Sequence, residues 1–195
     1  MYFIIALNPY QNLEEVIMKQ ALILIDIQNI YFTPGKYQLF NPEIAADNAR
    51  KVLHHFRQNE LPIIHVKHMF ESNLESNEYL CNFYKSVQPI NDETIIEKEH
   101  PSAFLKTMLE KVLDRFEIDT IVIAGMMSHM CIDTTVRAAY DLNYQVTVLD
   151  NACTTYDLNY NEEIIPANLV HKVFMSALND TFANVINVEE FISNN

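Results

Sequence analysis

Five short apolar runs separated by helix-like segments constrain the fold of this 195-residue chain more than any other feature. The runs are ALILI (21–25), PIIHV (62–66), TIIE (94–97), TIVIA (120–124) and QVTVL (145–149). Continuous apolar runs of this length are typical of strands that are buried on both faces. With a short final strand near 183–188, the pattern predicts one α/β domain with a mostly parallel sheet and right-handed crossovers.

Helical patterns lie between these runs. We expect helices over 41–59, 104–116, 129–142 and 162–178. Asn41 and Pro42 are typical of an N-cap followed by a first helical position. Residues 70–92 are polar, aromatic and irregular, which favours a long excursion over the surface that could act as a lid.

Glycine is almost absent from the chain. Only Gly35 and Gly125 are present, so neither a G-x-G-x-x-G dinucleotide turn nor a Walker A phosphate loop can be built. We expect Gly35 to serve a turn over 33–36. Gly125 ends the strand over 120–124, where we expect the most strained backbone of the chain.

Charge and cysteine content restrict the partners and the compartment. Thirteen Lys and Arg against 26 Asp and Glu give a net charge of −13, which repels nucleic acid and anionic lipid. The three cysteines lack CxxC spacing and fit free thiols in a reducing compartment. No apolar run approaches the roughly 20 residues of a membrane helix. We therefore expect a cytoplasmic protein with a small-molecule substrate and with neither nucleic-acid nor membrane partners.

The first residues form a segment apart. Residues 1–17 begin apolar but lack a basic region and contain Pro9 and two acidic residues, which makes them a poor signal peptide. Met18 runs directly into the first strand. We expect an N-terminal extension over 1–17 and a single domain over 18–195.

Polar residues follow the predicted strands at the ends where parallel sheets bind ligands. They are, in strand order, Asp26, His68, Lys98, Cys131 and Asp150. An acid, a base and a thiol at strand ends are typical of a nucleophilic enzyme. Asp150 is the exception, because an Asp at this position more often caps the next turn.

Cys131 is the strongest candidate for a nucleophile. With Ser128 as N-cap, Cys131 lies in the first turn of a helix, where free N–H groups favour a thiolate and can stabilise an oxyanion. Asp26 could accept the thiol proton, and Lys98 could hold Asp26 ionised or steady the thiolate. The alternative is that Cys131 is a small core residue, because free cysteines are usually buried and inert.

Three segments resemble the signature regions of the isochorismatase-like cysteine hydrolases. They are ALILIDIQNIYF from residue 21, IIEKEHPSAF from residue 95 and IVIAGMMSHMCIDTTVRAAYDLNYQVTVLDNAC from residue 121. They occur in the order and spacing of that family, and the resemblance extends from about Lys19 to the C-terminus. It implies that 18–195 is one hydrolase domain, with three α/β/α layers around a six-stranded parallel sheet.

The resemblance also implies roles for single residues. It implies a catalytic triad of Asp26, Lys98 and Cys131. It further implies a cis peptide between Met126 and Met127, with the N–H groups of Met127 and Cys131 as oxyanion donors. Members of the family are commonly dimers or larger, so we expect a homo-oligomer.

Two departures from the family narrow the chemistry. Nicotinamidases carry an Asp-x-His metal motif after the second strand, whereas HVKHMFE has His68 at the Asp position and Phe70 at the His position. His65 and His68 point to opposite faces of a strand, so we expect no metal and no other cofactor. Isochorismatases proper cleave a vinyl ether and commonly lack the cysteine. The presence of Cys131 therefore favours acyl chemistry on an amide or ureide.

Three further side chains are candidates for substrate contacts, each with a structural alternative. Tyr31 matches a pocket position of the family or is a core aromatic. His100 contacts substrate or is a loop residue, and His129 points into the site or caps the helix. Gln28 and Asn29 are expected to satisfy local backbone groups.

Together these features predict a metal-independent cysteine hydrolase that cleaves a C–N bond of a small amide or ureide through a thioester. One alternative is a vinyl ether hydrolase that uses Asp26 and Lys98 without the cysteine. A more remote alternative is a non-enzymatic receiver-like module, which also places Asp and Lys at strand ends. Receivers carry an acidic pair after the first strand, and Asp26 has no second carboxylate beside it.

Overall fold

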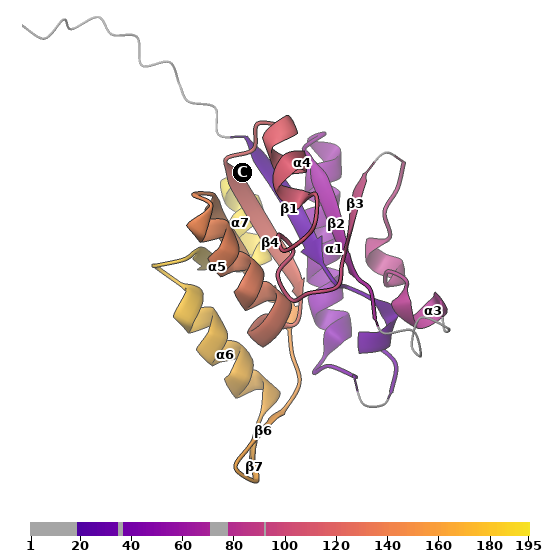
Figure 1. Ribbon diagram of the computed structural model, residues 1–195, viewed down its shortest axis with the longest axis vertical. Helices are drawn as coiled ribbons and strands as arrows, with labels where there is room; N and C mark the ends of the chain where they lie inside the picture. The colour runs from indigo at the N-terminus through magenta and orange to yellow at the C-terminus, as the bar shows by residue number, and fades with distance from the viewer. Residues whose placement is uncertain (1–18, 35–36, 71–77, 92) are drawn as a thin grey trace, which may run out of the picture.

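A six-stranded parallel sheet forms the centre of the computed structural model, which describes residues 19–34, 37–70, 78–91 and 93–195 (Figure 1). The strand order is β3-β2-β1-β4-β5-β8, and every neighbouring pair is parallel. The strands are β1 (Gln20–Ile25), β2 (Ile63–His68), β3 (Thr94–Lys98), β4 (Thr120–Met126), β5 (Gln145–Thr154) and β8 (Asn184–Ile186). The expected α/β fold with a six-stranded sheet is confirmed.

Helices cover both faces of this sheet. They are α1 (Pro42–Gln58), α3 (Glu78–Cys81), α4 (Leu109–Arg115), α5 (Asp133–Asp141), α6 (Ala167–Leu178) and α7 (Val188–Asn194), with short turns η1 (Asn29–Tyr31), η2 (Lys85–Val87) and η3 (Ser128–Ile132). In Figure 1, α1 and α7 lie behind the sheet, and α4, α5 and α6 lie in front. This arrangement gives three layers.

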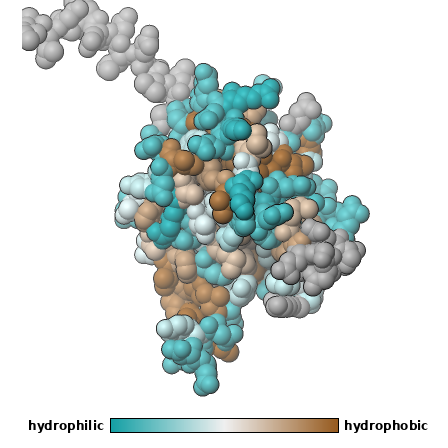
Figure 2. All heavy atoms as spheres, viewed as in Figure 1, coloured by the Kyte–Doolittle hydropathy of each residue, from teal (hydrophilic) through white to brown (hydrophobic). Residues whose placement is uncertain are grey.

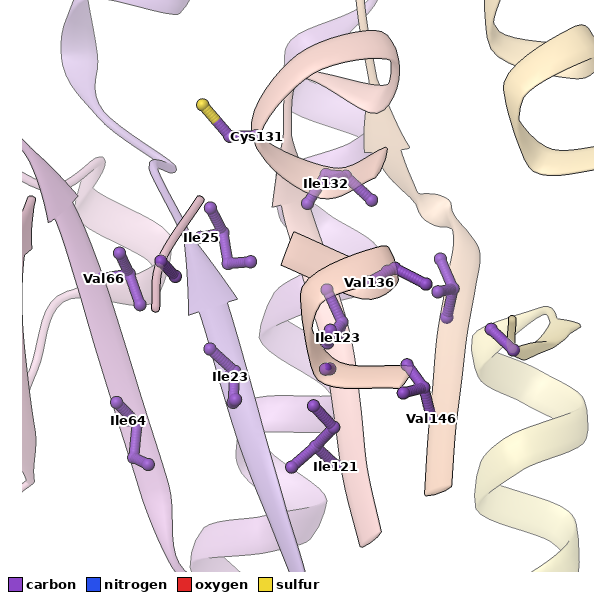
Figure 3. Packing of buried hydrophobic residues seen from close by; sticks show 14 of the residues in the cluster. Ile23, Ile25, Ile64, Val66, Ile121, Ile123, Cys131, Ile132, Val136 and Val146 are labelled. Carbon is purple, nitrogen blue, oxygen red and sulfur yellow. The ribbon is translucent and has the colours of Figure 1, made fainter. Parts of the chain in front are cut away.

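Each face of the sheet has its own apolar core, because successive strand residues point to opposite sides. Ile23 and Ile25 of β1 pack with α4, α5 and α6, whereas Leu22 and Leu24 pack with α1 and α7. Figure 3 shows the first of these cores, in which the labelled residues of β1, β2 and β4 lead up to Cys131 beyond the ends of the strands.

The helix expected over 104–116 is shorter in the structure, so this prediction is wrong in its first turn. The helix α4 begins at Leu109. Thr107 explains the late start, because its hydroxyl donates to the Ala103 carbonyl at 2.6 Å and accepts from the Leu109 N–H at 3.2 Å. Lys106 lies in the left-handed region with φ 57°. Such local side-chain bonds compete with helix formation.

The helix expected over 162–178 also begins late, at Ala167. Residues before it form a hairpin of β6 (Leu158–Tyr160) and β7 (Glu163–Ile165). Asn161 and Glu162 form its two-residue turn with φ of 48° and 65°, as left-handed hairpin turns require. The following helix is capped when Asp157 Oδ1 accepts from the Ala167 N–H at 2.7 Å.

Smaller corrections concern helix ends and strand lengths. Asn41 precedes α1 but has φ 46° and no side-chain cap bond, and its carbonyl accepts from the Ile44 N–H at 3.2 Å. The strand β5 continues to Thr154, five residues beyond its expected end. The helix α7 was not predicted.

Several expectations fall outside the described residues. These are the extension over 1–17, the Gly35 turn and part of the excursion over 70–92. Among the described residues, no helix is long and apolar enough to cross a bilayer.

Candidate active site

Three side chains from three different strand ends meet at the carboxyl edge of the sheet. Asp26 follows β1, Lys98 ends β3 and Cys131 lies in η3 after β4. Lys98 Nζ is 2.7 Å from Asp26 Oδ2 and 3.2 Å from Cys131 Sγ. The side chains of Asp26 and Lys98 are fully buried, so this ion pair is sealed from solvent in the described structure. The structure therefore brings together all three residues of the predicted triad.

The backbone around these residues adopts uncommon conformations. Gly125 has φ 140°, and a Cβ there would lie 2.0 Å from the carbonyl oxygen of Ile25, so only glycine fits. Asp26 itself has φ 53°, a region that Asp tolerates better than most residues. The peptide bond between Met126 and Met127 is cis, at the place that the family resemblance implies. Uncommon conformations thus flank the carboxyl ends of both central strands.

The turn η3 positions Cys131. The Met127 carbonyl accepts from the N–H groups of Met130 at 3.0 Å and Ile132 at 3.2 Å, which forms a wide π-helical turn that continues into α5. Figure 3 shows the sulfur of Cys131 above the end of β1. Cys131 thus lies in the first turn of this helical segment, as expected.

Ser128 does not cap this helix, so that prediction is wrong. Its side chain is fully buried and its hydroxyl lies 2.7 Å from Nδ1 of His171 on α6. Because the hydroxyl faces a neighbouring helix, it serves a tertiary contact instead of the helix end. His129 does not cap the helix either: its Nδ1 lies 2.5 Å from Oγ1 of Thr155.

Burial governs the protonation of the triad. Burial raises the pKa of the Cys131 thiol to about 12, and the Asp26 carboxylate adds to this effect while Lys98 opposes it. Burial also raises the pKa of Asp26, against the attraction of Lys98. Burial therefore works against the thiolate that the first helical turn is expected to favour. A raised carboxylate pKa makes Asp26 a better proton acceptor.

A fourth side chain, His68, also contacts Lys98. His68 Nδ1 lies 3.2 Å from Lys98 Nζ, and the carbonyl of His100 accepts from the same Nζ at 3.1 Å. Burial lowers the pKa of His68 to about 4, and Lys98 and His100 add to the effect. The sequence predicts His68 at a ligand-binding strand end but gives it no role in the site. The parallel register, which pairs His68 with Lys98, is the signal that could have found it.

The three candidates for substrate contacts occupy different places. Tyr31 is buried in η1, and burial raises its pKa, with further increases from the charges of Asp26 and Cys131. His129 packs edge-on against the ring of Tyr156 at 5.3 Å. His100 reaches the triad through its backbone carbonyl.

Gln28 and Asn29 bind distant backbone groups, so the expectation of local contacts is wrong. Gln28 Nε2 donates to the carbonyls of Cys81 at 2.6 Å and His68 at 3.0 Å. Asn29 Nδ2 donates to the carbonyl of Tyr79 at 2.8 Å. These two side chains hold the segment around α3 against the carboxyl end of β1.

The described residues do not bring together a metal-binding group. They contain no cluster of three or more His, Cys, Asp and Glu side chains that could hold an ion. His65 and His68 diverge, because His65 is buried with its Nε2 2.9 Å from Glu93 Oε2 while His68 faces Lys98. The absence of a metal cofactor stays a prediction.

Comparisons with known proteins agree with this geometry. The isochorismatase domain model matches residues 20–190. The uncharacterized isochorismatase family protein YddQ of Bacillus subtilis is 44% identical over 179 residues, covering 90% of this chain and 99% of its own. A crystal structure from Oleispira antarctica superimposes with a TM-score of 0.86 at 40% identity, covering 90% of this chain and 96% of the other.

Two more distant relatives have named activities. Nicotinamidase 3 of Arabidopsis thaliana is 26% identical over 170 residues, covering 79% of this chain and 80% of its own. The ureidoacrylate amidohydrolase RutB of Acinetobacter baylyi is 23% identical over 175 residues, covering 68% of this chain and 69% of its own. The match along nearly the whole described chain leads to one conclusion: the protein belongs to the isochorismatase family of hydrolases.

Proposed function

We propose that this isochorismatase-family protein is a metal-independent cysteine hydrolase that cleaves a C–N bond in a small amide or ureide. The observation that carries the proposal is the buried contact of one lysine with both an acid and a thiol. Lys98 Nζ lies within 3.2 Å of Cys131 Sγ and 2.7 Å of Asp26 Oδ2. A nucleophile within reach of a base that a third group holds in place is the geometry of covalent catalysis.

The first half of the reaction forms a thioester. Asp26 takes the proton of the Cys131 thiol as the sulfur attacks the substrate carbonyl, and Lys98 stabilises the negative charge that moves from carboxylate to sulfur. The N–H groups of Met127 and Cys131 donate to the oxyanion of the tetrahedral intermediate. Asp26 then returns its proton to the departing nitrogen, which leaves as ammonia or an amine.

The second half hydrolyses the thioester. A water molecule gives a proton to Asp26 and attacks the acyl carbon, and the same two N–H groups hold the new oxyanion. The C–S bond breaks, the sulfur regains the proton from Asp26, and the carboxylic or carbamic acid departs. Tyr31, His100 and His129 are proposed to contact the substrate.

Two lines of support come from relatives and from the site itself. Relatives include a nicotinamidase and a ureidoacrylate amidohydrolase, both of which hydrolyse C–N bonds. A vinyl ether hydrolase that uses only Asp26 and Lys98 has no need of a thiol at 3.2 Å from the lysine. A receiver-like module requires an accessible Asp, whereas Asp26 is 0% exposed.

The test is an ammonia-release screen over small amides and ureides with wild-type protein, Cys131→Ala and Cys153→Ala. Cys153 is a matched control, because it is also buried and its pKa is likewise raised to about 12, but it lies on β5. We expect Cys131→Ala to lose at least about a thousandfold in turnover and Cys153→Ala to remain active. Full activity of Cys131→Ala contradicts the mechanism, and pyruvate release from isochorismate by that variant favours the vinyl ether alternative.

We also propose that the protein forms a homo-oligomer. Apolar side chains gather over α6, as the brown area in the lower part of Figure 2 shows. Ile164, Leu169 and Val173 are 67%, 48% and 55% exposed. Exposed apolar patches commonly mark interaction surfaces. Light scattering is expected to give a mass above the 22.7 kDa of one chain, and a monomer at all concentrations contradicts the proposal.

A further inference from the structure

The ammonium group of Lys98 has more neighbours than it has hydrogens. Its Nζ lies 2.7 Å from Asp26 Oδ2, 3.1 Å from the His100 carbonyl, 3.2 Å from His68 Nδ1 and 3.2 Å from Cys131 Sγ. A lysine ammonium carries three hydrogens and cannot accept. One of the four neighbours must therefore be without a hydrogen from Lys98 at any moment.

Asp26 is the neighbour left without a hydrogen: Lys98 Nζ donates to Cys131 Sγ, whereas neither carboxylate oxygen of Asp26 has a hydrogen-bond partner among the described residues. Burial raises the pKa of the Cys131 thiol to about 12, against the attraction of the nearby Lys98 ammonium. The three hydrogens of Lys98 then serve Cys131, His68 and the His100 carbonyl, and Asp26 balances the ammonium charge at 2.7 Å. Two of these acceptors, His68 Nδ1 and the carbonyl, do not change charge when the thiol proton moves to Asp26.

We infer that His68 is a positioning residue for Lys98. Its neutral Nδ1 and the His100 carbonyl hold two ammonium hydrogens throughout the reaction, so the third stays directed at Cys131 Sγ. When Asp26 takes the thiol proton, this third hydrogen stabilises the thiolate. This inference deepens the proposed function and rests on it, because it assigns a partner to the lysine of the same site.

The tautomer of His68 follows from this contact. An ammonium can only donate, so Nδ1 must be the unprotonated nitrogen and the proton must lie on Nε2. Protonation of Nδ1 would set an N–H against the ammonium, and burial together with Lys98 and His100 disfavours it. Among the residues that the structure describes, the charged or titratable groups that lower the pKa of His68 are Lys98 and His100, and none of the causes is a carboxylate.

Two contacts hold His68 in this orientation. Gln28 is fully buried and binds the backbone of His68 on both sides: its Nε2 donates to the His68 carbonyl at 3.0 Å, and its Oε1 accepts from the His68 N–H at 2.9 Å. The ring of His68 packs edge-on against Phe70 with 4.9 Å between centroids. Gln28 also donates to the Cys81 carbonyl at 2.6 Å, so one buried side chain fixes the backbone of His68 against the segment around α3.

The test measures the thiol directly and needs no substrate. Purified full-length protein is treated with iodoacetamide at pH 8, and alkylation of each cysteine is followed by peptide mass spectrometry. Three proteins are compared: wild type, His68→Phe and His68→Asn. His68→Phe keeps a ring against Phe70 but removes the acceptor, whereas His68→Asn places an amide oxygen near the position of Nδ1 and cannot titrate.

We expect alkylation of Cys131 to fall about tenfold in His68→Phe, the effect of one lost hydrogen bond to a charged group. His68→Asn should restore the rate to within about threefold of wild type. Alkylation of Cys153, which is buried on β5, should be equal in all three proteins and reports any loosening of the fold.

Two results would overturn the inference. One is alkylation of Cys131 in His68→Phe at the wild-type rate or faster with Cys153 unchanged. The other is an equal loss in His68→Phe and His68→Asn, because the acceptor would then not be the cause. If His68→Phe does not fold, His68→Leu takes its place. An inactive amide screen with the expected alkylation pattern would contradict the proposed function and leave the role of His68 intact.

Discussion

Two ion pairs lie at opposite ends of the same sheet, the Arg57–Glu93 pair partly buried and the Asp26–Lys98 pair fully buried, and they differ in how completely their charges are satisfied. At the amino end of β3, Glu93 accepts from Arg57 Nε at 2.7 Å and Nη2 at 2.8 Å, from the Ile90 N–H at 3.0 Å, and lies 2.9 Å from His65 Nε2. At the carboxyl end, Asp26 has one cation at 2.7 Å and shares it with Cys131.

The carboxyl pKa moves in opposite directions at the two ends. Burial works to raise the pKa of Glu93, but the hydrogen bonds from Arg57 and Ile90 outweigh it and lower the pKa to about 2. At Asp26 burial wins, and the pKa is raised despite Lys98. A saturated carboxylate is a structural element, whereas one with a raised pKa is suited to proton transfer.

The volume of a nearby cavity does not identify the end of the sheet that holds the candidate active site. A cavity of about 620 Å³ opens beside Arg57, Glu93 and Thr94, at the amino ends of the strands. The triad lies at the carboxyl ends, where parallel sheets bind ligands. Incomplete satisfaction of buried charges locates the candidate site better than the volume of a cavity does.

The largest expected effect contrasts the two carboxylates directly. Asp26→Asn should lower turnover of a substrate found in the ammonia screen by about 10²- to 10⁴-fold, because it removes the proton acceptor. Glu93→Gln makes the same chemical change at the other end and should keep turnover within about twofold. Steady-state rates of the two variants check this, and an equal loss in both would show that the two ends are not separate in function.

The next effect concerns the backbone at the catalytic end. Gly125→Ala should lower the free energy of unfolding by more than about 3 kcal/mol, because the new Cβ would lie 2.0 Å from the Ile25 carbonyl at a φ of 140°. Ala124→Gly, one residue earlier in β4, should cost only about 1 kcal/mol. Urea unfolding measures both, and a Gly125→Ala variant as stable as Ala124→Gly would refute the account of this turn.

The smallest expected effect is the pH dependence of the stability that Glu93 contributes at the amino ends of the strands. The pKa of Glu93 is about 2 in the folded state and 4.5 ordinarily, so its contribution to stability is complete above pH 4.5 and is lost as the pH falls toward 2. We expect wild type to exceed Glu93→Gln in unfolding free energy at pH 6 by on the order of 1 kcal/mol, after allowance for solvent screening. This difference should shrink between pH 4.5 and 2 in urea titrations. A difference that is independent of pH would contradict the assignment.

The sequence predicted the sheet and the triad because both follow from simple rules. Buried apolar runs mark parallel strands, and their carboxyl ends share one edge, so Asp26, Lys98 and Cys131 meet there. The family resemblance added the cis peptide and the oxyanion donors. The same pattern could not show that Ser128 faces His171 or that Gln28 reaches Cys81, because those hydrogen bonds join residues that are 43 and 53 positions apart.

Local hydrogen bonds and turn conformations explain the remaining incorrect predictions of helix starts. The residues before α4 have an apolar pattern that suits a helix, but the Thr107 hydroxyl binds the backbone and delays the helix to Leu109. The hairpin before α6 depends on left-handed φ angles at Asn161 and Glu162. Neither side chain requires such an angle, so the sequence does not predict the turn. The residues at which these two helices begin are therefore determined by contacts that form only in the folded chain.

The most direct test of the account is to trap the acyl group on Cys131. Wild-type protein is mixed with a substrate from the screen, quenched in acid within one turnover, and analysed by intact and peptide mass spectrometry. We predict an added mass equal to the substrate less its departing amine, located on the peptide that contains Cys131, released by hydroxylamine and absent from Cys131→Ala. Turnover without this adduct, together with a wild-type rate in Cys131→Ala, would contradict the central claim.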